Sequence, residues 1–243
     1  MKKIFLITLF FAFALGAQAQ DGVINFNEEV FDFGAIDEGV KATHEFVFVN
    51  TGTTPVTINH VQPGCGCTTP DWPEEPIPPG GTSKITATFD SEGRPGVFNK
   101  SITISSDATE SMKTIYIKGI VIKKEEDSVA PTADQLKKSP AITLSNEKHD
   151  FGKLARAEKT SVKVQVKNTG KTPLTISDIK AACGCVSFKL NGESIPPKKT
   201  AELEIFYTPY FEGKNIDKVT IFTNDLKKPR ITFTLSADVF EAE

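Results

Sequence analysis

Two short stretches, Cys65-Gly66-Cys67 and Cys183-Gly184-Cys185, hold all four cysteines of this 243-residue chain. The second stretch begins 118 positions after the first. Three further motifs recur at the same offset: Asp32-Phe33-Gly34 with Asp150-Phe151-Gly152, Asn50-Thr51-Gly52 with Asn168-Thr169-Gly170, and Ile77-Pro78-Pro79 with Ile195-Pro196-Pro197. Recurrence at a fixed offset is the signature of duplicated structural units. The sequence therefore predicts two tandem copies of one domain, at residues 23–122 and 141–240.

The two copies identify each other's buried positions. Phe46 aligns with Val164, whereas its neighbour Val47 aligns with Gln165. Because strand side chains alternate between the two faces of a sheet, the first pair is predicted to point inward and the second outward. Similar alternation marks about seven short strands in each copy, separated by Gly and Pro turn signals, which is typical of an antiparallel sandwich. The predicted fold is all-β, with two tandem immunoglobulin-like antiparallel β-sandwich domains.

One section of the repeat is displaced by a single residue. Residues 96–107 align with residues 213–224 at an offset of 117 instead of 118. The second copy has therefore lost one residue in the preceding loop and regained it after residue 224. Loops tolerate such changes better than strands do.

Residues 1–19 have the layout of a secretory signal peptide. Two lysines precede an apolar run from Ile4 to Leu15, and Ala17-Gln18-Ala19 supplies small residues before a cut at Gln20. The apolar run is shorter than the roughly 20 residues that a membrane span requires. The mature chain is therefore predicted to be soluble and periplasmic or extracellular, without membrane insertion after signal cleavage.

Charge is distributed unevenly between the two copies. Residues 21–122 carry 14 acidic and 6 basic residues, whereas residues 141–243 carry 13 acidic and 16 basic residues. The acidic first copy is a poor partner for nucleic acid, which requires a basic surface. Opposite net charges favour docking of the two copies within a chain or between chains, although salt screens the attraction. Residues 123–140 are charged and poor in apolar side chains, so a flexible linker is predicted there.

The order of the motifs resembles the bacterial domain-of-unknown-function family numbered 1573. It is more distantly similar to the sandwich domains named for ASPM, SPD-2 and hydin, and to major sperm protein. The resemblance covers both copies and implies an immunoglobulin-like sandwich. It implies no activity, because that family has no established one. The second copy departs from the pattern at Lys198-Lys199, where the first has Gly80-Gly81, and at Val186, where the first has Thr68.

The Cys-Gly-Cys turns have four open interpretations, of which a disulfide within each turn is the first. An exported protein meets an oxidising compartment, which favours pairing Cys65 with Cys67 and Cys183 with Cys185. Each pair would need a tight bend, and the intervening glycine permits one because it tolerates positive φ. Closing so small a ring removes little entropy from the unfolded chain, so the bridge is not expected to stabilise the fold strongly.

The other three interpretations are a redox-active pair, a two-thiolate site for a soft ion such as Cu(I), and buried thiols that pack at the end of the sandwich. No His, Lys or Arg adjoins either pair to lower a thiol pKa. No third ligand is evident, because the nearest histidine, His60, has Asp178 at the matching place. Bridges between the two copies are also formally allowed. We therefore assign no catalytic residue, no cofactor and no metal site.

Two residues beside the first turn, Thr68 and Trp72, are the candidate contact residues for a partner. Trp72 has Leu190 as its counterpart and is either packed on the sandwich or exposed as a contact aromatic. No Ser-His-Asp arrangement or phosphate-binding glycine loop occurs in a supporting context, so the protein is not expected to be an enzyme. The predicted function is an exported, non-catalytic module that binds another protein or a cell-envelope component. The alternative is a thiol-based Cu(I) carrier or redox protein.

Overall fold

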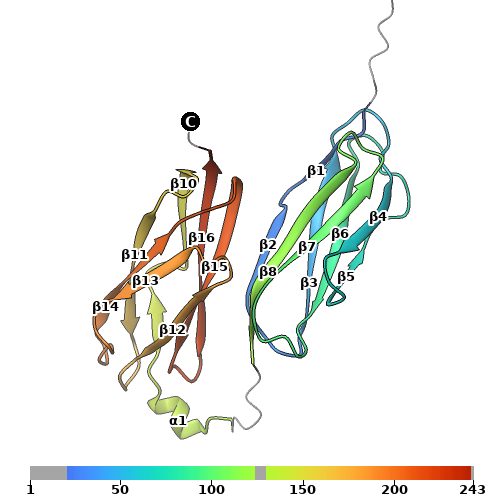
Figure 1. The fold of residues 1–243 in the computed structure, drawn as a ribbon. Coiled ribbons are helices and arrows are strands. Elements are labelled where there is room, and N and C mark those ends of the chain that lie inside the picture. Colours follow the sequence, from blue (N-terminus) through green and yellow to red (C-terminus); the bar gives the residue numbers. More distant parts are fainter. Residues whose placement is uncertain (1–20, 124–129, 242–243) are drawn as a thin grey trace, which may run out of the picture.

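The computed structural model describes residues 21–123 and 130–241, which form two tandem β-sandwich domains (Figure 1). The all-β prediction with two sandwiches is confirmed. The predicted signal peptide, residues 1–19, lies outside the described residues. Within the described ranges, the structure contains no helix of the length and apolar character needed to cross a membrane.

Domain 1 consists of eight strands in two sheets. The strands are β1 (Ile24–Phe26), β2 (Val30–Asp37), β3 (Lys41–Asn50), β4 (Ile58–Pro63), β5 (Thr68–Asp71), β6 (Thr82–Asp90), β7 (Gly96–Ser106) and β8 (Met112–Ile122). The strand orders are β1-β3-β6-β5 in one sheet and β2-β8-β7-β4 in the other. The alternation of aligned side chains does not predict β2, which contains the Asp-Phe-Gly motif, or β5, which follows the Cys-Gly-Cys turn.

Domain 2 repeats this arrangement strand by strand. Its strands are β9 (Ile142–Leu144), β10 (Lys148–Ala155), β11 (Thr160–Asn168), β12 (Ile176–Ala181), β13 (Val186–Leu190), β14 (Thr200–Tyr207), β15 (Gly213–Thr223) and β16 (Arg230–Phe240). The sheet orders are β9-β11-β14-β13 and β10-β16-β15-β12. Each strand of domain 2 therefore has a counterpart eight labels earlier in domain 1.

The Asp-Phe-Gly motif marks a β-bulge in a parallel strand pair. Among the described strands, β2 with β8 and β10 with β16 are parallel, and the other pairs are antiparallel. The register of each parallel pair shifts after the aspartate of the motif. Gly34 and Gly152 have φ values of +70° and +67°, in the left-handed region that glycine adopts without a steric cost. The bulge explains why the motif recurs.

The core of each domain lies between its two sheets, at the positions that the alignment of the copies predicts. Phe46 and Val164 have no exposed surface, whereas Val47 is half-buried and Gln165 is exposed. Domain 1 places the aromatic rings of Phe46 and Phe48 where domain 2 has valines, and it has further rings in its core. Its Phe89 ring, for example, stacks on Phe98 with 4.1 Å between ring centroids.

The Asn-Thr-Gly motif closes one end of each sandwich through a buried side chain. Asn50 has no exposed surface, and its Nδ2 donates to the carbonyl oxygens of Thr54 (2.7 Å) and Ile77 (2.9 Å). Its Oδ1 accepts from the N–H groups of Gly52 (3.0 Å) and Val23 (3.3 Å). The equivalent asparagine of domain 2 makes the same four bonds. One side chain thus ties together the end of β3 and three neighbouring loops.

Replacing Asn50 by Ala is predicted to lower the free energy of unfolding by about 2–4 kcal/mol. The cause is that buried backbone groups lose their partner, at about 1–3 kcal/mol each. Urea unfolding measures the change. Asn99 is exposed on β7, so Asn99→Ala is the matched control and should change stability by less than about 0.5 kcal/mol. Similar losses for the two variants would contradict the proposed role of Asn50.

A short helix, α1 (Ala133–Lys138), lies within residues 123–140, where a flexible linker is predicted. A capping box begins it: the N–H of Gln135 donates to Thr132 Oγ1 (3.3 Å), and the N–H of Thr132 donates to Gln135 Oε1 (2.7 Å). None of its residues is buried. The capping signature is present in the sequence, but six helical residues are too few to show an apolar period.

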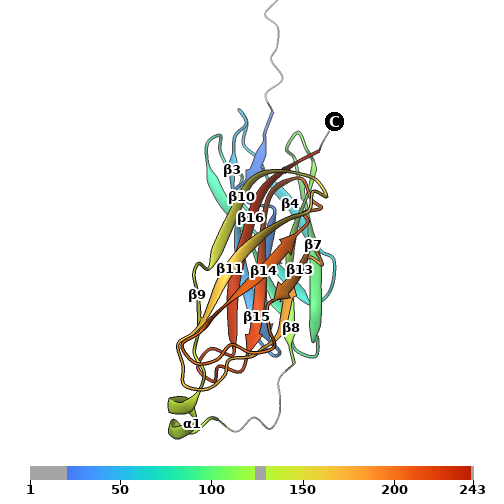
Figure 2. The ribbon, with the colours of Figure 1, turned by 90° about the vertical axis from the view of Figure 1, so that its left-hand side faces the viewer.

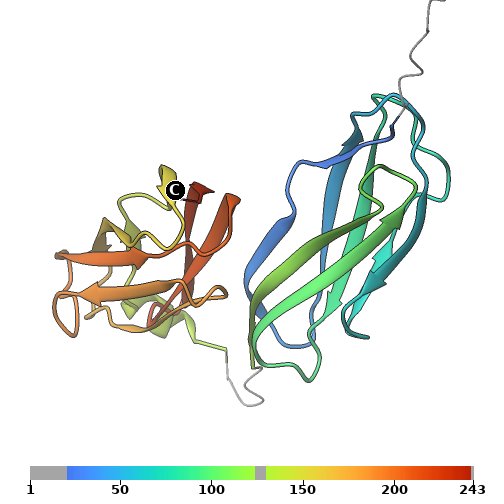
Figure 3. The ribbon, with the colours of Figure 1, turned by 45° about the horizontal axis from the view of Figure 1, so that its top comes forward.

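The two domains lie side by side and contact each other through different edges (Figures 1 and 3). Domain 1 presents β2 and β8, whereas domain 2 presents β15 and β12. Figure 2 views the pair with domain 2 in front of domain 1. In the repeat, β15 and β12 correspond to β7 and β4 of domain 1, so the two copies do not pack through equivalent strands.

Candidate functional site

Each Cys-Gly-Cys turn lies where the chain crosses from one sheet of its sandwich to the other. In domain 1 the turn joins β4 to β5, and in domain 2 it joins β12 to β13. Packed sheets are about 10 Å apart. Because the crossing uses only residues 64–67, or 182–185 in domain 2, the backbone must turn sharply there.

The structure joins each pair of cysteines in a disulfide within its own turn. The Cα atoms are 5.2 Å apart for Cys65–Cys67 and 5.0 Å apart for Cys183–Cys185, within the range that a disulfide requires. The second cysteine of each pair is buried, and its carbonyl oxygen accepts an N–H from the end of β6 or from the residue after β14, at 2.9 Å in both cases. With both pairs closed in this way, no bridge joins the two domains.

The two turns are not identical copies. Gly184 has a φ of +62°, whereas Gly66 lies outside the left-handed region, so only one of the two glycines adopts the positive φ that the sequence suggests. In domain 2 the N–H of Cys185 points at Cys183 Sγ, 3.3 Å away. In domain 1 the Cys65 sulfur instead lies 3.6 Å from Thr68 Oγ1.

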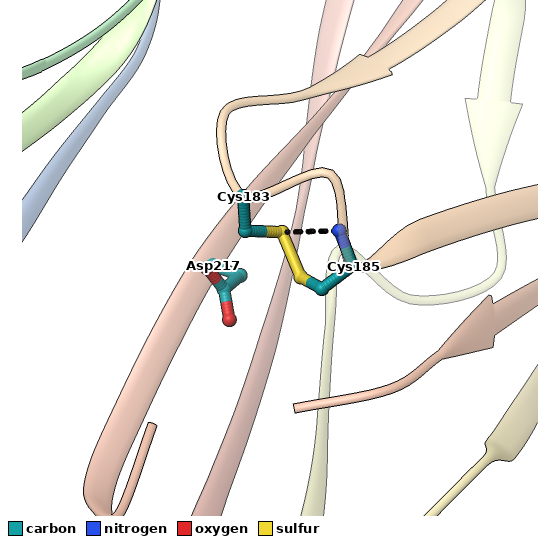
Figure 4. Close-up of side chains that lie close together, drawn as sticks. All are labelled: Cys183, Cys185 and Asp217. Atoms are coloured by element: carbon teal, nitrogen blue, oxygen red, sulfur yellow. Dashed lines mark hydrogen bonds between the residues drawn. A yellow bond between two sulfur atoms is a disulfide. The ribbon is translucent and has the colours of Figure 1, made fainter. Parts of the chain in front are cut away.

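A buried carboxyl group lies beside the second turn (Figure 4). Asp217 on β15 is 2% exposed, and one of its oxygens lies within 4.8 Å of the sulfur atoms of Cys183 and Cys185. The corresponding residue of domain 1 is Lys100. The sequence near the turns shows no third group of the metal-ligating kind, and the fold brings Asp217 beside the second turn. The sequence near the turn does not contain Asp217, because this residue lies on β15, and β13 and β14 come between the turn and that strand.

Asp217 also joins the two domains. Its Oδ1 pairs with the ammonium group of Lys118, on β8 of domain 1, at 2.5 Å. Its Oδ2 accepts a hydrogen bond from the hydroxyl group of Tyr207 at 2.6 Å. Burial, reinforced by the charge of Asp217 and by this hydrogen bond, raises the pKa of Tyr207 far above its usual value. The phenol therefore stays protonated and remains a donor.

A second buried carboxyl group, Asp32 on β2, holds the other side of the contact. Its Oδ1 accepts the N–H of Gly34 (2.7 Å), and its Oδ2 accepts the N–H of Lys218 in domain 2 (2.9 Å). Burial raises the pKa of Asp32, whereas the two N–H bonds and the charge of Lys118 oppose that rise. We call Asp32, Gly34 and Lys118 the domain 1 socket.

Two further contacts surround the domain 1 socket. The side chain of Lys218 lies over Gly34, where a Cβ would be 3.2 Å from Lys218 Cδ, and its ammonium group lies 4.9 Å from the centre of the Phe31 ring. Arg230 makes a two-pronged pair with Asp37 at 2.8 and 3.0 Å. The contact between domains is thus made largely by paired polar groups at hydrogen-bonding distance.

The two candidate contact residues of domain 1 lie beside its turn but are not free. Thr68 is only 3% exposed, so its side chain offers almost no surface to a partner. It is the first residue of β5, immediately after the sheet crossing, and its side chain is buried against the turn. Trp72 is half-buried, packs against the domain 1 core and makes an edge contact with His60, with 6.0 Å between ring centroids.

Besides Tyr116 on β8 (39% exposed) and Phe188 on β13 (43% exposed), three exposed aromatic residues lie at one end of domain 2. Tyr210 is 53% exposed, Phe211 is 61% exposed and Phe240 is 49% exposed; we call these three residues the aromatic end. Arg156 connects them, because its N–H donates to the Phe240 carbonyl oxygen at 2.8 Å and its guanidinium pairs with Glu212 at 3.6 Å. The sequence signal was the aromatic pair in a loop where domain 1 has Gly93 and Arg94, but the sequence alone does not show its exposure.

The sequence model of the family described as protein of unknown function (DUF1573) matches residues 24–121 and 142–239. The chain belongs to this family. The two matched stretches are the two sandwiches, so the chain contains two DUF1573 copies in tandem. No curated protein matches the chain.

Several solved structures are similar in fold to this tandem DUF1573 chain. One is a protein of unknown function from Porphyromonas gingivalis W83, with 13% identity and a TM-score of 0.41, covering 88% of this chain and 99% of that one. Another is the ASH/PapD-like domain of human CEP192, with 17% identity and a TM-score of 0.34, covering 49% and 98%. The periplasmic chaperone SfaE has 12% identity and a TM-score of 0.31, covering 90% and 100%.

Replacing Lys118 by Met in this DUF1573 protein is predicted to weaken the contact between domains by about 3–5 kcal/mol, because Asp217 would remain buried without its cation. Hydrogen exchange of the Lys218 amide, which is bonded to Asp32 across the contact, reports the opening. Its protection should fall on the order of a hundredfold to a thousandfold.

Lys84→Met is the matched control, because Lys84 pairs with Glu45 at an exposed site where both side chains are about half exposed. Exposed pairs contribute little, so the control should leave the Lys218 amide unchanged. Adding Asp217→Asn to Lys118→Met should restore part of the protection, since the unpaired charge is then gone. Unchanged protection in the Lys118 variant would contradict the importance of the buried pair.

Proposed function

We propose that this protein is an exported, non-catalytic tandem sandwich that binds another protein or a cell-envelope component through the aromatic end of domain 2. The observation that carries the proposal is the exposure of Tyr210, Phe211 and Phe240 on neighbouring segments. Tyr, Phe and Arg are enriched where proteins bind one another. Exposed aromatic groups that gather in one place are typical of such surfaces.

The loop that carries two of these rings is held in place from several sides. The N–H of Ala157 donates to the Pro209 carbonyl oxygen at 2.8 Å, and Asn215 Nδ2 donates to the carbonyl oxygens of Phe211 (2.7 Å) and Gly213 (2.9 Å). A pre-ordered loop loses little entropy on binding. Burying the exposed parts of the two rings would contribute about 5 kcal/mol before that cost.

A cleft of about 690 Å³ lies beside the aromatic end, between the two domains. It is lined by residues 25–30 of domain 1 and by residues 212–214, which directly follow Phe211. A partner segment that contacts the aromatic end would therefore have a concave surface next to it. This location differs from the turn of domain 1 that the sequence favours, where Thr68 is buried and Trp72 is packed.

Export and the absence of catalysis rest on separate observations. The layout of residues 1–19 supports export, and the two disulfides fit an oxidising compartment. The perturbed buried groups, Asp32 and Tyr207, are engaged in the contact between domains or next to it instead of lining a pocket for a substrate. This arrangement favours a structural use of groups that would otherwise suggest an active site.

A photo-crosslinking residue in place of Phe211 is predicted to capture a partner from the envelope or the medium of the cells that produce the protein. The same residue in place of Met112, which is 63% exposed on domain 1, is the control and should capture nothing. N-terminal sequencing of this protein, recovered from the same cells, should give Gln20 as its first residue. A Tyr210→Ser, Phe211→Ser double variant should compete for the partner at least tenfold less well than the unchanged protein.

A chain that keeps residues 1–19 and stays in the cytoplasm would refute export. Adducts of equal yield from positions 211 and 112 would refute the aromatic end as the contact surface. The two outcomes are independent, so each part of the proposal is tested by itself.

A second candidate function, thiol chemistry at the second turn, is favoured by one observation, the position of Asp217 beside Cys183 and Cys185. Reduction by a dithiol would deliver two electrons and two protons to the disulfide and leave two thiols. Two thiolates and one carboxylate are suitable ligands for a soft or borderline cation. Lys118 competes for the same carboxylate, so cation binding would require that ion pair to open.

After dithiol reduction and removal of the reductant, this second function predicts that one Cd²⁺ binds per chain through Cys183, Cys185 and Asp217. Asp217→Asn should weaken the binding, whereas Cys65→Ser with Cys67→Ser should leave it unchanged. Thiolate-to-cadmium absorption measures both. Equal cadmium binding by the two turns would contradict a role for Asp217. Four free thiols before reduction would show that the exported protein contains no disulfide.

A further inference from the structure

We infer that domain 2 carries an unfilled copy of the domain 1 socket, and that a second copy of this chain docks there through strand β7 of its domain 1. The inference concerns a different surface from the aromatic end. It rests on the equivalence of the repeats, on the exposure of the second socket and on charge complementarity.

The equivalent of the domain 1 socket is built from Asp150, Gly152 and Ser236, which we call the domain 2 socket. Asp32 stands opposite Lys118 in the β2–β8 register, and Asp150 stands opposite Ser236 in the β10–β16 register. Asp150 Oδ1 accepts the N–H of Gly152 at 2.9 Å, just as Asp32 accepts that of Gly34. The bulge and its side-chain bond are therefore preserved.

The domain 2 socket is open where the domain 1 socket is filled. Asp150 is exposed, whereas Asp32 is 3% exposed. Asp32 Oδ2 accepts the N–H of Lys218, whereas no group among the described residues donates to Asp150 Oδ2. A Cβ at Gly152 would meet no atom within 4 Å. A groove of about 220 Å³ lies there, and its lining includes the three socket residues and Lys214.

The segment that fills the domain 1 socket is an uncovered stretch of strand edge. Strand β15 pairs with β12 only from Val219 to Thr223, so its residues 213–218 extend beyond the end of β12. The Lys218 N–H at that uncovered edge is the group that reaches Asp32. An uncovered strand edge readily takes another chain as its partner.

Domain 1 has the same kind of edge on β7. Strand β7 pairs with β4 only from Ile102 to Ser106, so residues 96–101 extend beyond it, with a single backbone bond from Gly64 to Ser101. Lys100 and Ser101 are the counterparts of Asp217 and Lys218. This edge belongs to the side of domain 1 away from β2, so domain 2 of the same chain does not cover it.

The charges of the two free surfaces are complementary, with signs reversed relative to the contact within the chain. Within the chain, Lys118 of the socket meets Asp217 of the strand edge. Between chains, the domain 2 socket has Ser236 in place of Lys118 and keeps the carboxylate of Asp150, while the β7 edge offers Lys100 in place of Asp217. Lys214 at the rim of the domain 2 socket would face domain 1 of the docking chain, which carries 14 acidic and 6 basic residues.

Docking of this kind is head-to-tail. Each chain would offer one socket on domain 2 and one strand edge on domain 1. Successive chains would therefore form an open filament, unless the rotation between neighbouring chains closes them into a ring. The contact within the chain gains from the linker, which holds the domains at high effective concentration, whereas the contact between chains does not. We therefore expect weak, concentration-dependent association.

Sedimentation equilibrium of the mature chain tests the inference, over concentrations on the order of 10 µM to 1 mM, where weak interfaces dissociate. The average mass should rise with concentration beyond that of a dimer. Asp150→Lys and Lys100→Glu should each weaken association roughly tenfold or more by placing like charges together. Glu193→Lys, an equal charge change at an exposed loop position, should have no effect.

Combining the variants distinguishes this docking from other modes. An equimolar mixture of the Asp150→Lys and Lys100→Glu chains should again assemble beyond a dimer, because contacts with the native charges alternate with contacts in which the charges are exchanged. The double variant in a single chain should assemble again, since the charges are exchanged. A single-chain mass at every concentration would overturn the inference. Assembly that survives both single variants but is lost in Lys118→Met would also overturn it, because that result indicates exchange of domains between chains.

Discussion

The relative position of the two sandwiches depends on one buried ion pair, Lys118 with Asp217 (7% and 3% of the side chains exposed). Bringing two charges out of water costs nearly as much as their attraction returns, so a buried pair adds little net stability. Its effect is on specificity: any other arrangement of the domains would leave a buried charge unpaired. Tyr207 donates to the other oxygen of Asp217, and the neighbouring carboxylate Asp32 accepts the Lys218 N–H, so both buried carboxylates at this contact have partners.

The duplicated fold and the contact between domains follow different rules. The fold recurs because the positions that define it recur: the inward strand positions, the bulge glycine and the buried asparagine. The contact does not recur, because Asp217 has Lys100 as its counterpart and Lys118 has Ser236. Two identical copies would offer the same socket and the same edge twice and would specify no preferred pairing. Divergence at these few surface positions is what selects one pairing within the chain.

The sequence predicts the fold well because the core positions of a sandwich follow from local alternation along each strand, as Phe46 and Val47 illustrate. The site is harder to predict, because it depends on residues that only the folded chain brings together. Asp217 reaches the second disulfide from β15, and Lys118 reaches Asp217 from the other domain. Thr68 looks available beside the turn, but the sheet crossing turns it inward. The exposure of Phe211 depends on loop packing that has no sequence period.

The Cys-Gly-Cys turn is better understood as a corner than as a source of stability. By crossing to the other sheet at residues 64–67 and 182–185, the chain ends β4 and β12 early and leaves the first half of β7 and of β15 without a neighbour on that side. Uncovered strand edges invite association, and proteins normally cover them. On β15 the cover is β2 of domain 1, held by Asp32 and Lys118. On β7 the same chain supplies only Gly64, so the corner that creates the contact between domains also creates an edge that another chain can use.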